Sequence, residues 1–192
     1  MTTPFLFGYG SILWRQEFKP SRTLSGKLAG YSRMLAQQST DHRGTQARPG
    51  IVATLIRAPD RLVVGKLFEV PQDEFDRVFD ILDHREKNGY QLVDVDIDTE
   101  DGMLAARTYI APPDNPWYLG QKPIEALASI VIGAEGPSGS NLDYVLRLYQ
   151  EAHTLGYVEP ELEALLELLW RRQDVRLRAS TLGIQCLIAE GC

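Results

Sequence analysis

The first third of the chain has the apolar and polar pattern of β-strands. Runs rich in β-branched and aromatic residues, bounded by turn-forming residues, predict strands at residues 5–9, 23–37, 51–57 and 61–70. Gly26 and Gly30 interrupt the second run. Pro59-Asp60 separates the last two runs, and we therefore predict that they form a hairpin.

The period changes at Pro71. Apolar residues recur from there at the spacing of one helix face, and proline suits a first helical turn. Asn88-Gly89 is a typical pair at the end of a helix. We predict a helix that stops near Lys87, with Phe75, Val78, Phe79 and Leu82 on its apolar face and carboxylates on the opposite face.

A second hairpin and several helices are predicted for the remainder. Strands are predicted at residues 91–98, where apolar and acidic residues alternate, and at residues 103–111. A loop rich in proline and asparagine covers residues 112–120. Helices are predicted at residues 123–134, 141–156 and 160–172, the last with a leucine stripe. Residues 173–192 have no clear pattern, and we interpret them as a loosely attached C-terminal tail.

Mixed strands with separate helices indicate an α+β fold. A small mixed sheet that closes, or nearly closes, into a barrel would leave few exposed edges, with the helices at its periphery. A chain of 192 residues fits one domain. We predict a single domain over residues 1–172, followed by the tail.

Charge and cysteine content narrow the class of partner. The net charge of −6 argues against nucleic acid and anionic membrane surfaces, and favours a small-molecule substrate. Cys186 and Cys192 are too few and too close for a disulfide framework or a zinc site. The apolar run at the N-terminus is too short for a signal peptide or a membrane span. We predict a cytoplasmic protein without a metal site, and its oligomeric state stays open.

Three segments carry candidate chemistry. In the first, a strand enters the turn Gly8-Tyr9-Gly10-Ser11, whose backbone N–H groups can approach an anion closely; a tight turn without a ligand is an equal alternative. In the second, residues 39–45 place many polar groups between two strands. They form either a solvated hairpin loop or one wall of a polar pocket.

The third segment places Glu86 at the C-terminal end of the predicted helix. The negative pole of the helix disfavours a carboxylate there, although Arg85 and Lys87 can offset this. Glu86 is therefore either an ordinary solvated helix end or a functional residue. Functional sites are where local rules are most often broken.

Taken together, these segments resemble the ChaC branch of the γ-glutamylcyclotransferases. The resemblance runs from about residue 5 to about residue 157. It rests on stretches in the family's order: 9–14 (YGSILW), 39–44 (STDHRG), 49–50, 85–87 (REK), 89–90, 109–111, 113–120 and 136–141. Three features depart from the family pattern: the order of Ile12 and Leu13, the histidine at His84, and the asparagine at Asn88. These departures bear on substrate preference.

The resemblance implies a cofactor-independent lyase that cleaves glutathione to 5-oxoproline and cysteinylglycine by ring closure. Glu86 would be the general acid and base of this reaction. Candidate substrate-binding residues are Leu6, Phe7, Gly8, Tyr9, Gly10, Ser11, Ser39, Asp41, Arg43, Tyr118, Asn141 and Tyr144. Two alternatives stay open: a cyclotransferase for other γ-glutamyl amines or amino acids, and a noncatalytic module that binds γ-glutamyl metabolites.

Overall fold

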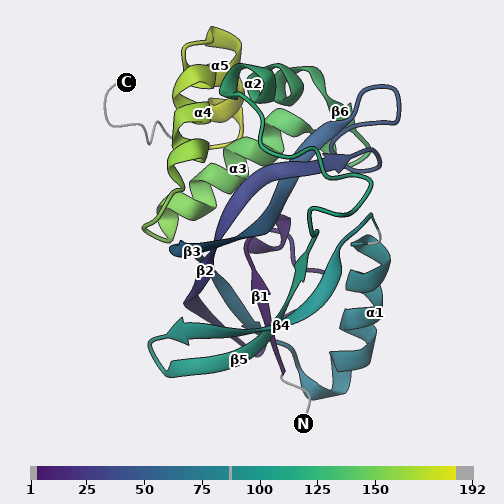
Figure 1. The fold of residues 1–192 in the computed structure, drawn as a ribbon, viewed down its shortest axis with the longest axis vertical. Helices are drawn as coiled ribbons and strands as arrows, with labels where there is room; N and C mark the ends of the chain where they lie inside the picture. The colour runs from purple at the N-terminus through teal and green to yellow at the C-terminus, as the bar shows by residue number, and fades with distance from the viewer. Residues whose placement is uncertain (1–3, 87, 185–192) are drawn as a thin grey trace. The chain divides into compact units, whose positions relative to one another are not determined.

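A computed structural model describes residues 4–86 and 88–184, which form two compact units (Figure 1). The first unit comprises residues 4–33 and 55–116, and the second comprises residues 34–54 and 117–184. Strands β2 (Arg22–Ser39) and β3 (Gly50–Glu69) run from one unit into the other. Each unit is described below by itself. The single domain predicted over residues 1–172 stays a prediction.

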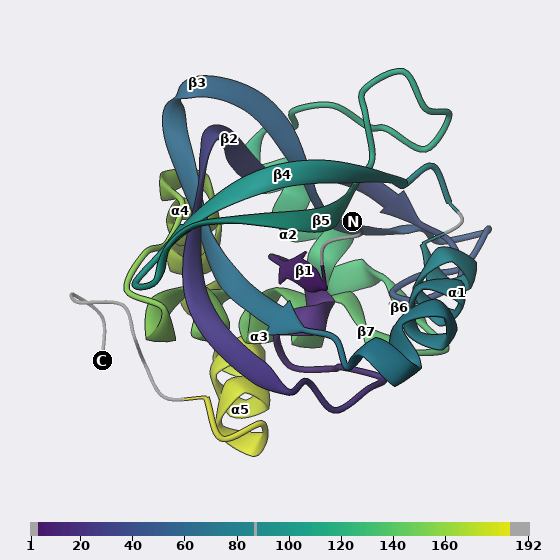
Figure 2. The same cartoon turned by 90° about the horizontal axis from the view of Figure 1, so that it is seen from below.

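The first unit is built on a closed barrel of strands in the order β1-β3-β2-β4-β5. Its other strands are β1 (Phe5–Gly8), β4 (Gln91–Thr99) and β5 (Gly102–Ile110). β1 pairs antiparallel with β3, and a parallel pairing of Leu6 with Arg107 of β5 closes the barrel. Figure 2 shows β4 and β5 lying side by side as the predicted hairpin. The α+β class and the small mixed barrel are confirmed.

Two predicted interruptions in the strands were wrong. β3 continues through Pro59 and Asp60 as one strand, so the hairpin predicted at this pair does not exist. Both residues are exposed, and a proline at an exposed strand position removes no buried ladder hydrogen bond. β2 likewise continues through Gly26 and Gly30.

The helix predicted from Pro71 is present and packs on the barrel. Pro71 precedes a short 3₁₀ turn, η2 (Gln72–Glu74), and α1 (Phe75–Arg85) follows it. Val78, Phe79 and Leu82 are buried in one cluster with residues of β1, β3 and β5. Burying such a side chain is worth about 1.5–3 kcal/mol. This face therefore fixes α1, and with it the helix end that carries Glu86.

Helices dominate the second unit. The predicted helices are α2 (Ile124–Gly133), α3 (Asn141–Thr154) and α4 (Pro160–Trp170). A two-stranded hairpin of β6 (Glu135–Gly136) and β7 (Gly139–Ser140) joins α2 to α3. The leucine stripe of α4 is buried, as predicted.

The segment interpreted as a tail contains a helix that its pattern did not predict. α5 (Gln173–Thr181) contacts α3 and α4 and buries Val175 and Ala179. Cys186 and Cys192 lie outside the described residues. Over residues 4–86 and 88–184, no helix is both long enough and apolar enough to span a membrane.

Candidate active site

The first candidate segment forms a strand end followed by one 3₁₀ turn. β1 ends at Gly8, and η1 (Ser11–Leu13) begins after Gly10. The turn is closed by the Leu13 N–H, which donates to the Gly10 carbonyl at 3.0 Å. The side chains of Leu6, Phe7 and Tyr9 are buried in the first unit. A ligand at this segment would therefore meet mainly backbone groups and the half-buried Gly10 and Ser11.

Gly8 is required by close packing. Its φ is outside the positive region, but a Cβ at this position would lie 2.3 Å from the Ile12 side chain and 2.8 Å from the Phe68 ring. Any larger residue would push β1 away from the start of η1. The glycine thus keeps the strand and the turn in contact, whether or not a ligand binds there.

Glu86 caps the C-terminal end of α1. Its backbone N–H donates to the Leu82 carbonyl at 2.8 Å, and its φ of −93° and ψ of 19° take the chain out of the helix. The side chain is 22% exposed, so solvent reaches the carboxylate only in part. The prediction that the helix ends at this carboxylate is confirmed.

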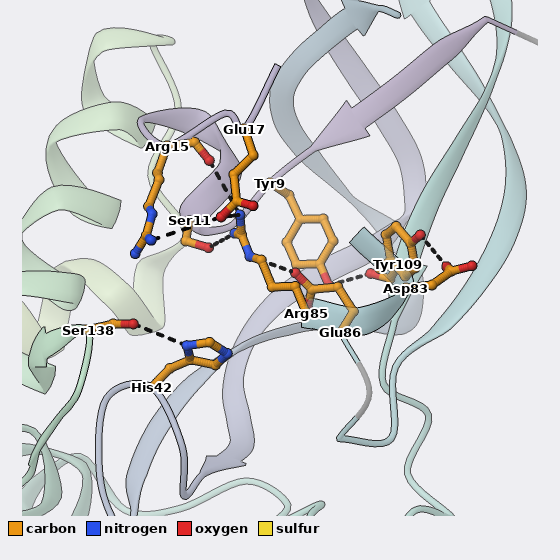
Figure 3. Close-up of polar contacts among 10 residues, drawn as sticks. All are labelled: Tyr9, Ser11, Arg15, Glu17, His42, Asp83, Arg85, Glu86, Tyr109 and Ser138. Carbon is orange, nitrogen blue, oxygen red and sulfur yellow. Dashed lines mark hydrogen bonds and ion pairs between the residues drawn. The ribbon is translucent and has the colours of Figure 1, made fainter. Parts of the chain in front are cut away.

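Arg85 connects this carboxylate to the turn (Figure 3). Its Nε lies 3.3 Å from Glu86 Oε1, and its Nη2 donates to Ser11 Oγ at 2.5 Å. Its Nη1 lies 3.7 Å from Glu17 Oε1 and donates to the Arg15 carbonyl at 3.4 Å. The predicted turn and the predicted catalytic carboxylate therefore contact one guanidinium within the first unit.

A second set of contacts holds the last turn of α1 against β5. The Tyr109 hydroxyl donates to Asp83 Oδ1 at 2.5 Å, and the Tyr9 hydroxyl donates to the Tyr109 carbonyl at 2.6 Å (Figure 3). Burial raises the pKa of Tyr109 well above its usual range. The hydrogen bond to Asp83 and the negative charges of Asp83 and Glu86 raise it further. Tyr109 is therefore a neutral hydrogen-bond donor at physiological pH.

The second candidate segment, residues 39–45, is an ordered loop in the second unit. The buried Ser39 Oγ accepts the Arg43 N–H at 2.9 Å, and Asp41 is half-buried. The Arg43 guanidinium lies 5.7 Å from the centre of the Tyr144 ring and donates to the Ser140 carbonyl at 3.4 Å. This unit thus brings Ser39, Arg43 and Tyr144 together.

The loop packs tightly against the β6–β7 hairpin. A Cβ on Gly136 would lie 2.4 Å from the His42 carbonyl oxygen, and one on Gly44 would lie 2.1 Å from the Gly50 nitrogen. His42 Nδ1 also lies 3.1 Å from Ser138 Oγ (Figure 3). A larger residue at Gly44 or Gly136 would clash with these backbone atoms, which explains why glycine stands at both positions. The same close packing holds the loop in place within its unit.

Tyr118, Asn141 and Tyr144 each contact strand backbone. Tyr118 forms an isolated bridge with Gln37 of β2. The fully buried Asn141 accepts the Ile51 N–H at 2.7 Å and donates to the Ile51 carbonyl at 2.8 Å. The Tyr144 hydroxyl accepts the Ala53 N–H at 3.0 Å. These contacts give Asn141 and Tyr144 a structural function, and substrate binding by them stays a prediction.

The structure therefore places the predicted site residues in two sets. The first unit holds Glu86 and the segment from Leu6 to Ser11, and the second holds Ser39, Asp41, Arg43, Tyr118, Asn141 and Tyr144. Arg85, Asp83 and Tyr109 were not predicted as site residues. Arg85 had one usable signal, a permanent positive charge next to a candidate catalytic carboxylate.

Comparison with known proteins adds independent information. The family model described as "ChaC-like protein" matches residues 4–172. The glutathione-specific gamma-glutamylcyclotransferase 1 of Homo sapiens is 38% identical over 149 residues, covering 75% of this chain and 67% of the relative. Gamma-glutamylcyclotransferase 2-3 of Arabidopsis thaliana is 37% identical over 164 residues, covering 80% and 81% of the two chains.

A solved structure agrees with these matches. The crystal structure of a yeast γ-glutamylcyclotransferase specific to glutathione superposes with a TM-score of 0.80. The match covers 88% of this chain and 97% of the yeast chain, at 26% identity.

Proposed function

This chain belongs to the family of ChaC-like proteins, and on that premise we propose that it is a γ-glutamylcyclotransferase that cleaves glutathione to 5-oxoproline and cysteinylglycine. One structural observation connects this proposal with particular residues. Arg85 contacts both Ser11 of the predicted substrate-binding turn and the Glu86 carboxylate. Within the first unit, a group that can transfer protons is thereby linked to a segment that can hold the substrate.

The reaction is an internal displacement. The α-amino nitrogen of the γ-glutamyl group attacks its own γ-carbonyl carbon and closes a five-membered lactam. The amide bond to cysteine breaks, and cysteinylglycine leaves as the free amine. Intramolecular attack has effective molarities on the order of 10⁵ M or more when the geometry is held. The main task of the protein is therefore to hold the folded-back substrate.

Glu86 is the proposed proton carrier. Its carboxylate takes a proton from the attacking amine and delivers one to the departing nitrogen, so no net proton is consumed. General acid–base catalysis of this kind contributes roughly 10²- to 10⁴-fold. The backbone N–H groups at Gly10 and Ser11 are proposed to bind the γ-glutamyl group and to stabilise the developing oxyanion.

The absence of a metal or cofactor from this reaction stays a prediction, as does the cytoplasmic location. Glutathione helps to keep the thiols of the cytosol reduced. The predicted location would therefore place the enzyme together with its substrate.

The proposal is tested by product analysis. Incubation with glutathione, followed by mass spectrometry, is expected to give 5-oxoproline and cysteinylglycine in equal amounts. Glutathione acetylated on its α-amine should not be cleaved, because an amide nitrogen is too poor a nucleophile to close the ring. A panel of γ-glutamyl amino acids run in parallel measures the preference for glutathione.

Competition against glutathione is the control for the blocked compound, since the acetyl group can also prevent binding. Two results would contradict cyclotransfer: free glutamate in place of 5-oxoproline from glutathione, or cysteinylglycine released from the acetylated compound. A strong preference for other γ-glutamyl compounds would keep the reaction type but overturn the choice of substrate.

A further inference from the structure

The contacts of Arg85 join the end of α1 to the start of η1 and to the loop that follows η1. The side chain extends from the last residue of α1 and is only 14% exposed. Oxygen atoms of Ser11, Arg15, Glu17 and Glu86 surround its guanidinium at 2.5–3.7 Å. Such a planar group binds several oxygens in a fixed geometry, which a flexible lysine ammonium cannot do.

The position of Glu86 explains why it needs such a partner. Its backbone has left the helical conformation, and a glutamate side chain has several rotatable bonds. A proton carrier must nevertheless stay within hydrogen-bond reach of the atoms that it serves. Helix α1 alone fixes the Glu86 backbone, but it does not fix the carboxylate.

Another arginine on the same helix shows what an ordinary surface pair looks like. Arg77 is 55% exposed and pairs with Glu74, three residues before it. That contact joins α1 to η2, the turn directly before it in the chain. Arg85, by contrast, is mostly buried and bonds a residue 74 positions away. Simple stabilisation of the helix end requires neither feature.

We infer that Arg85 is a positioning residue for the cyclotransferase reaction: its Nε orients the Glu86 carboxylate while its Nη2 ties that carboxylate to the substrate-binding turn at Ser11. This inference rests on the proposed function and extends it to a residue with no assigned role. Arg85 itself takes no part in bond making. Its loss should therefore reduce turnover much more than substrate affinity.

The test compares Arg85→Gln, Arg85→Lys and the control Arg77→Gln with the wild type, using glutathione as substrate. For Arg85→Gln, kcat is expected to fall about 10- to 100-fold while KM changes less than threefold, since misplacing a catalytic group by about 1 Å can cost that much. Arg85→Lys keeps the charge but cannot bond both partners, so its kcat should be intermediate. Arg77→Gln should match the wild type.

The outcomes separate this inference from the proposed function. A wild type that makes no 5-oxoproline from glutathione contradicts the proposed function and, with it, the role of Arg85. With an active wild type, only the Arg85 inference fails if Arg85→Gln keeps its kcat, if the loss is confined to KM, or if Arg85→Lys equals the wild type. Thermal unfolding shows whether each variant is folded. If Arg85→Gln does not fold, the kcat of Arg85→Lys tests the inference instead. If neither variant folds, Arg85 is a purely structural residue and the inference is wrong.

Discussion

Asn141 is fully buried at the start of α3, and its carboxamide bonds both polar groups of the Ile51 backbone. The side chain thus pairs with the β3 backbone on both sides of the Ile51 Cα, in the way that a neighbouring strand would. A buried backbone N–H or C=O that loses its partner costs about 1–3 kcal/mol. At the residue scale, this gives Asn141 a structural function in the second unit.

Asn141→Ala is therefore expected to lower the free energy of unfolding by about 2–4 kcal/mol, because it leaves both Ile51 groups unpaired. Urea unfolding measures the change. Gln150→Ala, on the same helix, is the control and should stay within about 0.5 kcal/mol of the wild type. Unchanged stability together with a raised KM for glutathione would instead support the predicted role of Asn141 in substrate binding.

At the scale of elements, the least expected contact is the one between α5 and α3. Arg178 of α5 donates to both carboxylate oxygens of Asp143, at 2.6 Å and 2.5 Å. These hydrogen bonds, with smaller contributions from Ser140 and from the charges of Arg178 and Arg43, hold the pKa of Asp143 below its usual value. The pair therefore ties the C-terminal helix to the helix that carries Asn141.

This pair should make the stability of the protein depend on pH. A carboxyl group with a lowered pKa in the folded state stabilises the fold above its unfolded pKa of about 3.9, and the effect is lost as pH falls through the folded pKa. Arg178→Gln should therefore lower Tm at pH 7, and the difference from the wild type should shrink in acid.

Arg172→Gln is the matched control for this measurement. Arg172 pairs with the exposed Asp174 at the start of α5, and exposed pairs contribute little. The account of Asp143 is contradicted if Arg178→Gln has the same Tm as the wild type at pH 7. It is also contradicted if the difference in Tm between the two proteins is as large in acid as at pH 7.

At the scale of the whole molecule, the sequence predicted the elements with a regular pattern. The alternation in β4 and the leucine stripe of α4 were sufficient, because burial follows the period of each element. α5 was missed because Val175 and Ala179 alone are too small an apolar face to reveal a helix. Pro59 was misread because proline is harmless at an exposed strand position.

The candidate site was predictable only in part. Glu86 could be found from its unfavourable position at a helix end, supported by the family resemblance. The contact of Arg85 with Ser11 could not, because it arises only when the barrel brings the end of β1 next to the end of α1. The family resemblance implied that Asn141 and Tyr144 bind substrate, whereas the structure shows both bonded to strand backbone.

The central claim is that one carboxylate, that of Glu86, transfers the protons of the ring closure. Glu86→Gln keeps the shape of the side chain and removes the group that titrates. The measurement is the rate of 5-oxoproline formation from glutathione, with glutathione binding and thermal unfolding recorded on the same preparation. We expect the rate to fall at least about 100-fold, with binding and fold retained.

Glu74→Gln is the control, since it removes a carboxylate just before the other end of α1, where it pairs with Arg77. Its rate should equal that of the wild type. If Glu86→Gln is folded and forms 5-oxoproline within a few-fold of the wild-type rate, Glu86 is not the proton carrier and the account of this site is wrong.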